Sequence, residues 1–294
     1  MTEFNFGAFR RIPRIDVGSF PFKAEVRNFA HYTLHVDYHD IAHIQALAEF
    51  GKAMIHTDRR VQRAAYEFLQ KAGVMPFIKK FQSGRVVEGG FPPDYGDLFY
   101  LYSYIRTRQP RRVLEYGSGI STLVMALALR QNGGAGRLVS IEPSEEWAQK
   151  TRAGLPAHLL ERSEVICSPG MHCEVEGRDT VCFAERPLAN PDMIYIDGAP
   201  QGACFDGAEN VALLEENFDE DGVTIFIDGR RRAVHFFNLA SRARRFEISS
   251  YAVDIEDVHT GTTFTCPFGF DQFSNTMVRW RGPSPERRGM SADD

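Results

Sequence analysis

The sequence lacks a long hydrophobic run, an excess of basic charge and an apolar leader segment. Its longest apolar run, Leu123 to Leu129, is far too short to span a bilayer. The 34 Lys and Arg residues against 39 Asp and Glu residues give a formal net charge of -5, which argues against a general nucleic-acid-binding surface. The first residues also lack the continuous apolar stretch of a signal peptide. These absences predict a cytoplasmic protein with no membrane partner and no nucleic-acid partner.

Closely spaced cysteine pairs are missing as well. The chain has 5 cysteines, an odd number, and none of them forms a C-x-x-C motif typical of a zinc knuckle or a redox couple. The cysteines are Cys167, Cys173, Cys182, Cys204 and Cys266. The simplest interpretation is that all of them are reduced thiols.

The composition is otherwise that of an ordinary folded protein. A chain of 294 residues with 43% hydrophobic and 25% charged residues has room for one large domain or two small ones. Glycine and proline are concentrated in residues 83–96, which marks a connection between two modules. We therefore expect a mainly helical N-terminal cap over residues 1–90, a core domain over 91–281 and a disordered tail over 282–294.

The N-terminal module contains one clear helical pattern. Apolar residues recur every three or four positions from Asp40 to Gly73, which predicts a helix that ends at the glycine. Residues 32–38 alternate between apolar and polar types, which fits a half-buried strand at least as well as a helix. Four histidines spaced four apart can share a metal only on a continuous helix, and we favour a partly exposed polar face for them. They are His31, His35, His39 and His43.

From about residue 94 the pattern alternates between helices and strands. Helices are expected near residues 94–108, 120–131, from Ser144, 203–216 and 231–242. Strands are expected at RVLEY, RLVSIE, EVIC, DMIYID and VTIFID, with two further extended segments near 246–253 and 275–281. Because several strands are apolar throughout, this order predicts an α/β fold with a mostly parallel sheet covered on both faces.

A glycine turn between the first of these strands and its helix is the strongest functional signal. The turn reads Glu115-Tyr116-Gly117-Ser118-Gly119-Ile120-Ser121-Thr122. Its two glycines permit a tight turn and a close approach of the backbone to a ligand, and the helix start offers unpaired N–H groups. Glu142 ends the next strand, where a carboxylate can accept hydrogen bonds from both ribose hydroxyls. The pattern predicts a ligand of the adenosine type.

A nicotinamide dinucleotide is the first rival ligand. Its binding fingerprint has a third glycine at the position where this sequence has Thr122, so binding of a pyrophosphate is disfavoured. An oxidoreductase therefore remains only as a lesser alternative.

The E-x-G-x-G pattern, the acid at the end of the second strand and Asp197 together resemble the class I S-adenosylmethionine-dependent methyltransferases. The segments VLEYGSGISTLVMA, VSIEPSEEWA and DMIYIDGAP are most similar to the small-molecule branch called methyltransferase family 24, and more distantly to catechol-type O-methyltransferases. The resemblance covers about residues 92–281. It implies a Rossmann-like, seven-stranded methyltransferase sheet, S-adenosylmethionine as cofactor and a small-molecule acceptor methylated at oxygen.

The resemblance also assigns residues to the cofactor. Glu115, Gly117, Ser118 and Gly119 would bound its methionine end, and Ser121 or Thr122 would reach its carboxylate. Glu142 would take the ribose hydroxyls, Pro143 and Trp147 would lie near the adenine, and Ser168 would replace the acid that often accepts from the adenine amino group.

Two acids at strand ends are the catalytic candidates. Asp197 and Asp228 follow neighbouring strands and should lie side by side at the carboxyl edge of the sheet. In catechol-type relatives, acids at these positions and a following Asn hold a divalent cation, but here Gly229 follows Asp228. Mg²⁺ bound by two carboxylates and waters is conceivable but not favoured. The alternatives are a cofactor-side role for Asp197 and a helix N-cap for Asp228.

Basic residues follow the second acid. Arg230 or Arg231 can clamp a carboxylate or phosphate of the acceptor, and His235 is a candidate base because imidazole titrates near neutrality. A solvated helix start is the alternative for the arginines.

We therefore expect a small-molecule O-methyltransferase whose N-terminal cap either covers the active site or forms the interface of a homodimer. The alternative is a catalytically silent S-adenosylmethionine-binding protein that recruits a partner through its N-terminal module.

Overall fold

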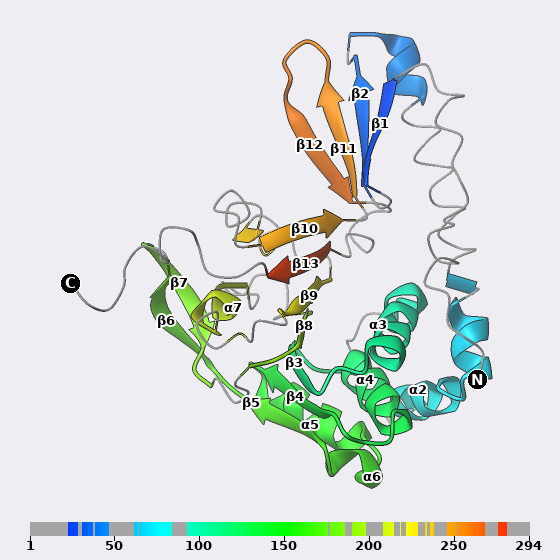
Figure 1. Ribbon diagram of the computed structural model, residues 1–294, viewed down its shortest axis with the longest axis vertical. Helices are drawn as coiled ribbons and strands as arrows, with labels where there is room; N and C mark the ends of the chain where they lie inside the picture. Colours follow the sequence, from blue (N-terminus) through cyan, green and yellow to red (C-terminus); the bar gives the residue numbers. More distant parts are fainter. Residues whose placement is uncertain are drawn as a thin grey trace.

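The computed structural model, drawn in Figure 1, describes most of the core domain and parts of the N-terminal module. The described residues are 23–28, 31–37, 39–46, 62–63, 65–83, 93–175, 177–185, 190–197, 208–214, 218, 222–228, 233, 236–237, 246–250, 252–267 and 276–280. The predicted tail over 282–294 and most of the predicted helix over 231–242 lie outside these residues.

A seven-stranded sheet forms the centre of the molecule, in the order β10-β13-β9-β8-β3-β4-β5. Its strands are β3 (Arg112–Tyr116), β4 (Arg137–Glu142), β5 (Ser163–Cys167), β8 (Met193–Ile196), β9 (Thr224–Ile227), β10 (Phe246–Ser250) and β13 (Thr276–Trp280). The first five are parallel, whereas β13 is antiparallel to both β9 and β10. The prediction of an α/β fold with a mostly parallel sheet is confirmed.

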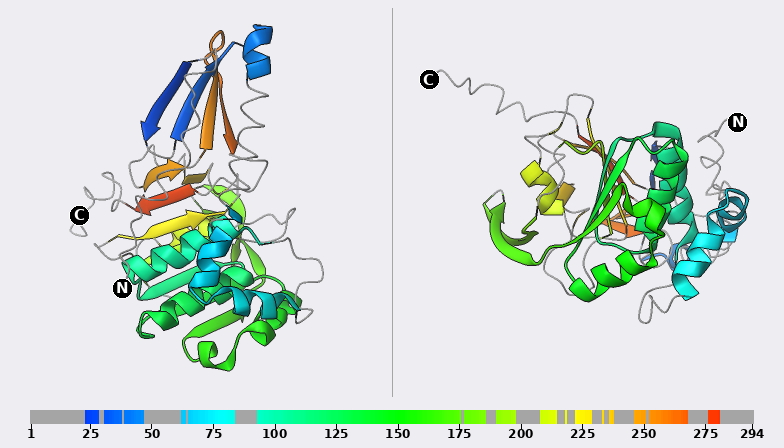
Figure 2. Two further views of the ribbon diagram at one scale, coloured as in Figure 1. Left: turned by 90° about the vertical axis from the view of Figure 1, so that its right-hand side faces the viewer. Right: turned by 90° about the horizontal axis from the view of Figure 1, so that it is seen from below.

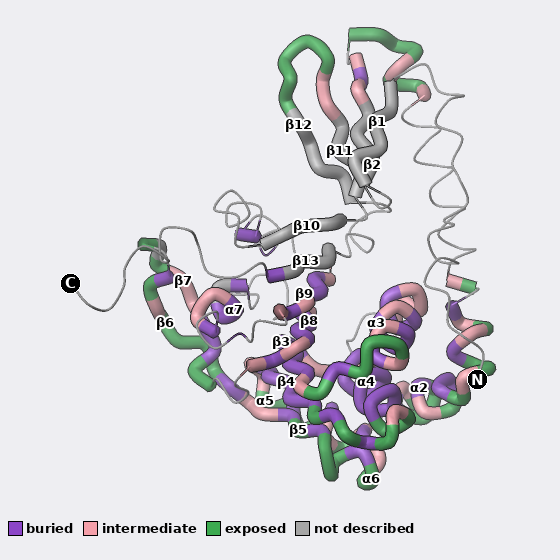
Figure 3. Tube along the Cα trace, viewed as in Figure 1, coloured by how far each residue is buried: buried purple, intermediate pink, exposed green. Residues whose placement is uncertain are grey.

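Both faces of this sheet are covered, which explains why its central strands are apolar throughout. One face packs against α2 (Met75–Phe81), α3 (Tyr95–Arg108), α4 (Ile120–Gln131), α5 (Glu145–Gly154) and α6 (Ala157–Leu160). The other face packs against α7 (Ala208–Leu214) and the hairpin of β6 (Gly170–Val175) and β7 (Arg178–Phe183). Figure 2 shows the two layers on either side of the sheet, and Figure 3 shows that burial is concentrated along the sheet and the inner helix faces. No helix among the described residues is both long and apolar enough to cross a membrane.

The β6–β7 hairpin was not predicted, and it corrects the interpretation of the cysteines. Cys173 and Cys182 form a disulfide across the hairpin, so the expectation that all five thiols are reduced is wrong for this pair. The two residues come together because the antiparallel register brings positions nine apart in sequence onto neighbouring strands. Phe183 then stacks on Tyr116, which fixes the hairpin to the sheet.

A second, smaller sheet joins the two ends of the chain. It has the order β1-β2-β11-β12, with strands β1 (Lys23–Asn28), β2 (His31–Val36), β11 (Ala252–Asp257) and β12 (Thr263–Pro267). In Figures 1 and 2 this sheet stands away from the helices that cover the central sheet. β2 pairs in parallel with β11, whose hairpin partner β12 lies before β13 in the chain.

The description of the N-terminal module as mainly helical is therefore wrong for residues 23–36. Their alternating pattern is that of a strand, and a partner strand from beyond residue 250 stabilises it. The same strand separates the histidines, since His31 and His35 lie in β2 whereas His39 and His43 follow it. Within the described residues, no group of three or more His, Cys, Asp or Glu side chains is arranged to hold a metal ion. The domain limits stay a prediction.

The described helical parts of the N-terminal module are 41–46, 62–63 and 65–71, followed by α2. Gly73 has φ +74°, the left-handed conformation that ends a helix, as predicted. Phe68 packs edge-to-face on Phe99 of α3, with ring centroids 4.7 Å apart. This contact places the 65–71 helix on the core domain.

Gln62 fastens the start of α3. Its side-chain Nε2 donates to the Asp94 carboxylate at 2.6 Å, and its Oε1 accepts from the Tyr95 backbone N–H at 2.8 Å. Asp94 also accepts from the Asp97 N–H and so caps the helix. The Gln62 amide therefore hydrogen-bonds both the capping carboxylate of Asp94 and the backbone N–H of Tyr95 in the first turn of the helix.

Gln62→Ala should lower the free energy of unfolding by about 1–2 kcal/mol, because it removes two hydrogen bonds and leaves a buried helix end unsatisfied. Urea unfolding monitored by circular dichroism measures this. Gln70→Ala, at an exposed position, is the control and should change stability by less than about 0.5 kcal/mol. Equal stabilities for the two variants would contradict the role of Gln62.

Candidate functional site

The predicted site residues that the structure describes lie near the carboxyl ends of the parallel strands of the central sheet. Backbone hydrogen bonds continue the ladder beyond the strands: Gly117 N–H donates to Ile141 at 2.8 Å, and Ser168 N–H to Glu142 at 2.9 Å. The strand order changes direction between β3 and β8, and ligands of such sheets bind at the carboxyl ends beside this point. The edge is therefore the expected location of a ligand.

Glu115 lies fully buried in β3 beneath the glycine turn. Three hydroxyl groups donate to its carboxylate: Ser121 at 2.5 Å, Thr122 at 2.6 Å and Ser140 at 2.5 Å. Ser140 is its partner in the β3–β4 register, a role that the sequence analysis missed although aligning the two strands would have shown it. Burial raises the pKa of Glu115 to about 7, against the lowering effect of the three hydroxyls.

The glycine turn has the backbone that its glycines allow. Gly117 has φ +103°, a conformation that strains other residues, which explains the glycine there. The Gly119 N–H donates to the Thr122 hydroxyl at 2.9 Å. The hydroxyls of Ser121 and Thr122 are thus engaged within the chain, and their predicted contact with a cofactor carboxylate stays a prediction.

Glu142 occupies the predicted place at the end of β4. Its Oε1 accepts from the Ser144 N–H and its Oε2 from the Ser118 hydroxyl, each at 3.1 Å. The residue is 4% exposed, and burial raises the pKa of its carboxyl group. Glu142 is therefore a carboxylate acceptor beside the glycine turn.

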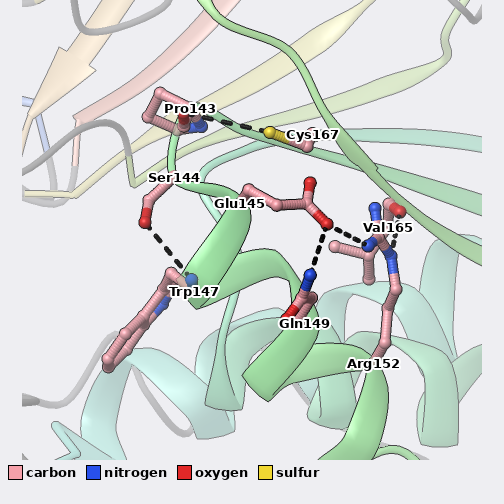
Figure 4. Close-up of polar contacts among 8 residues, drawn as sticks. All are labelled: Pro143, Ser144, Glu145, Trp147, Gln149, Arg152, Val165 and Cys167. Carbon is pink, nitrogen blue, oxygen red and sulfur yellow. Dashed lines mark hydrogen bonds and ion pairs between the residues drawn. The ribbon is translucent and has the colours of Figure 1, made fainter.

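The start of α5 brings an indole ring to the same place. Ser144 caps the helix by accepting from the Trp147 N–H at 3.2 Å. Figure 4 shows the Trp147 ring pointing away from the Glu145–Arg152 pair of the same helix. Its Nε1 donates to the Ser118 carbonyl at 2.7 Å and lies 4.0 Å from where a Cβ on Gly119 would stand. A flat aromatic ring thus borders the glycine turn.

The predicted adenine side is the end of β5. The Pro143 carbonyl lies 4.0 Å from the Cys167 sulfur, a contact also drawn in Figure 4. The Ser168 side chain is fully buried and accepts from the Glu185 N–H at 2.9 Å. A role for Pro143 or Ser168 toward adenine stays a prediction.

The acidic pair follows β8 and β9. The Asp197 N–H donates to Tyr116 and the Asp228 N–H to Ile196, both at 2.9 Å, so the two acids follow adjacent strands as predicted. The buried Tyr195 hydroxyl donates to Asp228 at 3.3 Å.

Tyr195 and a third acid were missed by the sequence analysis. Burial raises the pKa of Tyr195 well above its usual value, and the charges of Asp197, Asp228 and Asp97 add to the effect. Asp97 is 7% exposed and lies in the first turn of α3. An acid at this position is common because it interacts favourably with the helix N-terminus, so the sequence alone does not mark Asp97 as a site residue. Arg230, Arg231 and His235 lie outside the described residues.

The residues present fit an adenosine-type ligand. A carboxylate acceptor, a glycine turn and an indole ring meet at the switch point of the sheet, and each supplies a different kind of contact with a nucleoside. For a divalent cation, the described residues supply two strand-end carboxylates and no third ligand beside them.

Glu115→Gln should remove a pH dependence of stability. Between about pH 4.5 and 7 the unfolded chain has lost this proton while the folded chain keeps it, so the free energy of unfolding of the wild type falls as pH rises. Below that pH range the raised pKa of Glu115 does not change the free energy of unfolding. Above it, the loss of stability is constant. Relative to wild type, the variant should gain about 2–3 kcal/mol between pH 5 and pH 8 in urea unfolding. Glu164→Gln, at an exposed position on β5, is the control, and a difference that does not change with pH would contradict the effect.

Comparison with known proteins gives a match to part of the core domain. A family model described as a methyltransferase domain matches residues 114–229. No curated protein sequence matches the chain.

Three solved structures illustrate the similarity. An O-methyltransferase from Bacillus cereus in complex with SAH is 17% identical, with a TM-score of 0.47, over 70% of this chain and 89% of that chain. The O-methyltransferase TomG from Streptomyces achromogenes in complex with SAM is 17% identical, with a TM-score of 0.45, over 77% and 99%. The SAH-bound methyltransferase PaMTH1 from Podospora anserina is 14% identical, with a TM-score of 0.47, over 69% and 87%. A likeness of this degree says nothing about the acceptor.

The family match is consistent with the sheet. Counted from β3, the strands β5-β4-β3-β8-β9 follow the doubly wound order 3-2-1-4-5, and the matched residues run from β3 to the end of β9. The segment from β3 to the end of β9 therefore matches a methyltransferase domain.

Proposed function

We propose that this protein binds S-adenosylmethionine at the β3–β4 edge and transfers its methyl group to a hydroxyl oxygen of a small molecule. The observation that carries the proposal is the buried Glu142 carboxylate, which ends β4 beside the glycine turn of β3. A ribose has two adjacent hydroxyls, and a carboxylate in this position accepts from both. When bound, the cofactor supplies an activated methyl group.

The chain's own residues would hold the rest of the cofactor. The Gly117–Gly119 turn would bound its methionine end, with the start of α4 supplying backbone N–H groups for the carboxylate. Trp147 borders the same turn and would pack against the nucleoside. Asp197 follows β8 on the other side of the switch point, where it would face the methionine amino group or the acceptor.

The acceptor hydroxyl must lose a proton as the new bond forms. Asp228 is the candidate that holds this proton, because it ends the neighbouring strand and the Tyr195 hydroxyl orients its carboxylate. His235 as a second candidate base, and Arg230 or Arg231 as clamps for an acidic acceptor, stay part of the proposal on sequence grounds alone. Most of the catalytic effect would come from aligning the acceptor oxygen with the methyl carbon.

The expectations about partners and location also stay proposals. They are a small-molecule acceptor, no membrane or nucleic-acid partner, and a possible homodimer. The cytoplasmic location is a proposal of the same kind, and a disulfide such as Cys173–Cys182 is a bond more common in oxidising compartments.

Glu142→Gln should abolish stabilisation by S-adenosylhomocysteine. At about 100 times its dissociation constant, this ligand should stabilise the wild-type fold by about 2.7 kcal/mol, which a thermal-shift assay detects as a rise of a few degrees in Tm. The amide loses the charge that favours the ribose hydroxyls and should show little or no shift.

Glu161→Gln, an exposed position, is the control and should behave as wild type. NADH serves as the rival ligand. Stabilisation by NADH in place of S-adenosylhomocysteine would contradict the proposal.

Asp228→Asn should slow methyl transfer by about 100-fold or more, because the amide cannot hold the acceptor proton. The measurement is release of S-adenosylhomocysteine with a panel of phenols and catechols, with and without EDTA. Affinity for S-adenosylhomocysteine should stay within about twofold, and EDTA should have no effect, since Gly229 replaces the third cation ligand.

Asp179→Asn, exposed on β7, is the matched control. Equal rates for the two variants would contradict the role of Asp228. Ligand binding without transfer to any hydroxyl or amine acceptor would favour the silent alternative.

A further inference from the structure

The Ser118 hydroxyl has two partners at the same distance. It lies 3.1 Å from Oε2 of Glu142, to which it donates, and 3.1 Å from Oγ1 of Thr151. Between two hydroxyls either atom can donate, so Ser118 can give its proton to Glu142 or to Thr151. Rotation about a single side-chain torsion separates the two arrangements.

The carboxylate that Ser118 contacts through its hydroxyl also accepts from the backbone N–H groups of Ser144 and Ser118. Oε1 of Glu142 accepts from the Ser144 N–H at 3.1 Å, and the residue is 4% exposed. Because burial disfavours the charged form of Glu142, a donor at Oε2 stabilises the carboxylate when no ligand does so. Ser118 provides that donor from within the chain.

The backbone of Ser118 is held by hydrogen bonds on both sides of the residue's hydroxyl contacts. Trp147 Nε1 donates to the Ser118 carbonyl at 2.7 Å, and the neighbouring Gly117 N–H donates to Ile141 at 2.8 Å. Thr151 is 1% exposed on α5, so its hydroxyl also has a fixed position. The two partners of Ser118 are therefore both rigid parts of the site.

We propose that Ser118 is an internal competitor for the ribose-binding carboxylate, and that a nucleoside diol takes Glu142 by transferring the Ser118 hydrogen bond to Thr151. This inference rests on the proposed function, since it places a ribose at Glu142. It adds that an exchange of hydroxyl groups sets the affinity for the cofactor. As a ribose hydroxyl begins to donate to Oε2 of Glu142, the Ser118 hydroxyl stops donating to it and donates to Thr151. Ser118 and Thr151 are then positioning residues that tune the affinity.

The test is the binding of adenosine, followed by the fluorescence of Trp147. The chain has 2 tryptophans, and Trp280→Phe leaves Trp147 as the single probe; Trp280 is buried against Phe218 on the other face of the sheet. In this background Ser118→Ala should tighten adenosine binding about threefold to tenfold, the size expected for removing one competing hydrogen bond. Binding of 2′,3′-dideoxyadenosine, which lacks the 2′- and 3′-hydroxyls of the diol, should change by less than about twofold.

Thr151→Val supplies the second arm. It keeps the shape of the side chain but removes the alternative acceptor, so adenosine binding should weaken about threefold to tenfold. In the double variant the loss should vanish and the affinity should equal that of Ser118→Ala, because no displaced hydroxyl remains. Ser83→Ala, at an exposed serine after α2, is the control, and urea unfolding checks that each variant is folded.

The outcomes separate the inference from the proposed function. If Glu142→Gln leaves adenosine binding unchanged, the ribose is not at this carboxylate and the proposed function itself fails. If Glu142→Gln weakens binding but Ser118→Ala does not tighten it, only the exchange is wrong. Equal tightening for adenosine and the dideoxynucleoside would also overturn the exchange, since the effect would then not involve the ribose hydroxyls.

Discussion

The buried carboxylate of Glu115 is the constraint on which the geometry of the site depends. It lies on the helix-covered face of the sheet, in register with Ser140 on one side and Tyr195 on the other. Removing an acid from water is unfavourable by several kcal/mol unless hydrogen bonds compensate. Here the compensation comes from three hydroxyls, two of which belong to the first turn of α4. Satisfying Glu115 thus requires α4 to begin directly above the end of β3.

The same constraint shapes the glycine turn between β3 and α4. The Thr122 hydroxyl donates to Glu115 and accepts from the Gly119 N–H, so the acid fixes the turn through one intermediate group. From the side, Trp147 of α5 holds the Ser118 carbonyl. The backbone of the turn is therefore held from below by the sheet and from the side by a second helix.

Features encoded by neighbouring residues could be predicted from the sequence. The strands β3, β4, β8 and β9, the glycine turn and the strand-end positions of Glu142, Asp197 and Asp228 follow from local patterns and from the geometry of parallel sheets. Features that depend on distant partners could not. β2 pairs with β11, more than 200 residues later, and the local alternation of residues 32–38, which fits a strand, cannot identify this partner. The Cys173–Cys182 bond likewise depends on a hairpin whose first strand, β6, is mostly exposed and gives a weak pattern.

Thr122 bears on the identity of the ligand both through the sequence pattern and through its hydrogen bonds in the structure. As a sequence signal, it disfavours a dinucleotide because the fingerprint has glycine at this position. In the structure its hydroxyl receives the Gly119 N–H, one of the backbone donors that a pyrophosphate would otherwise approach at a turn of this type. The Thr122 hydroxyl, which donates to the buried Glu115 carboxylate, thus also occupies a backbone N–H that a phosphate would otherwise contact. The Glu142 carboxylate lies at the proposed position of the ribose. Stability of the fold and the proposed preference for a nucleoside without a pyrophosphate would in this way be consequences of the same side chain.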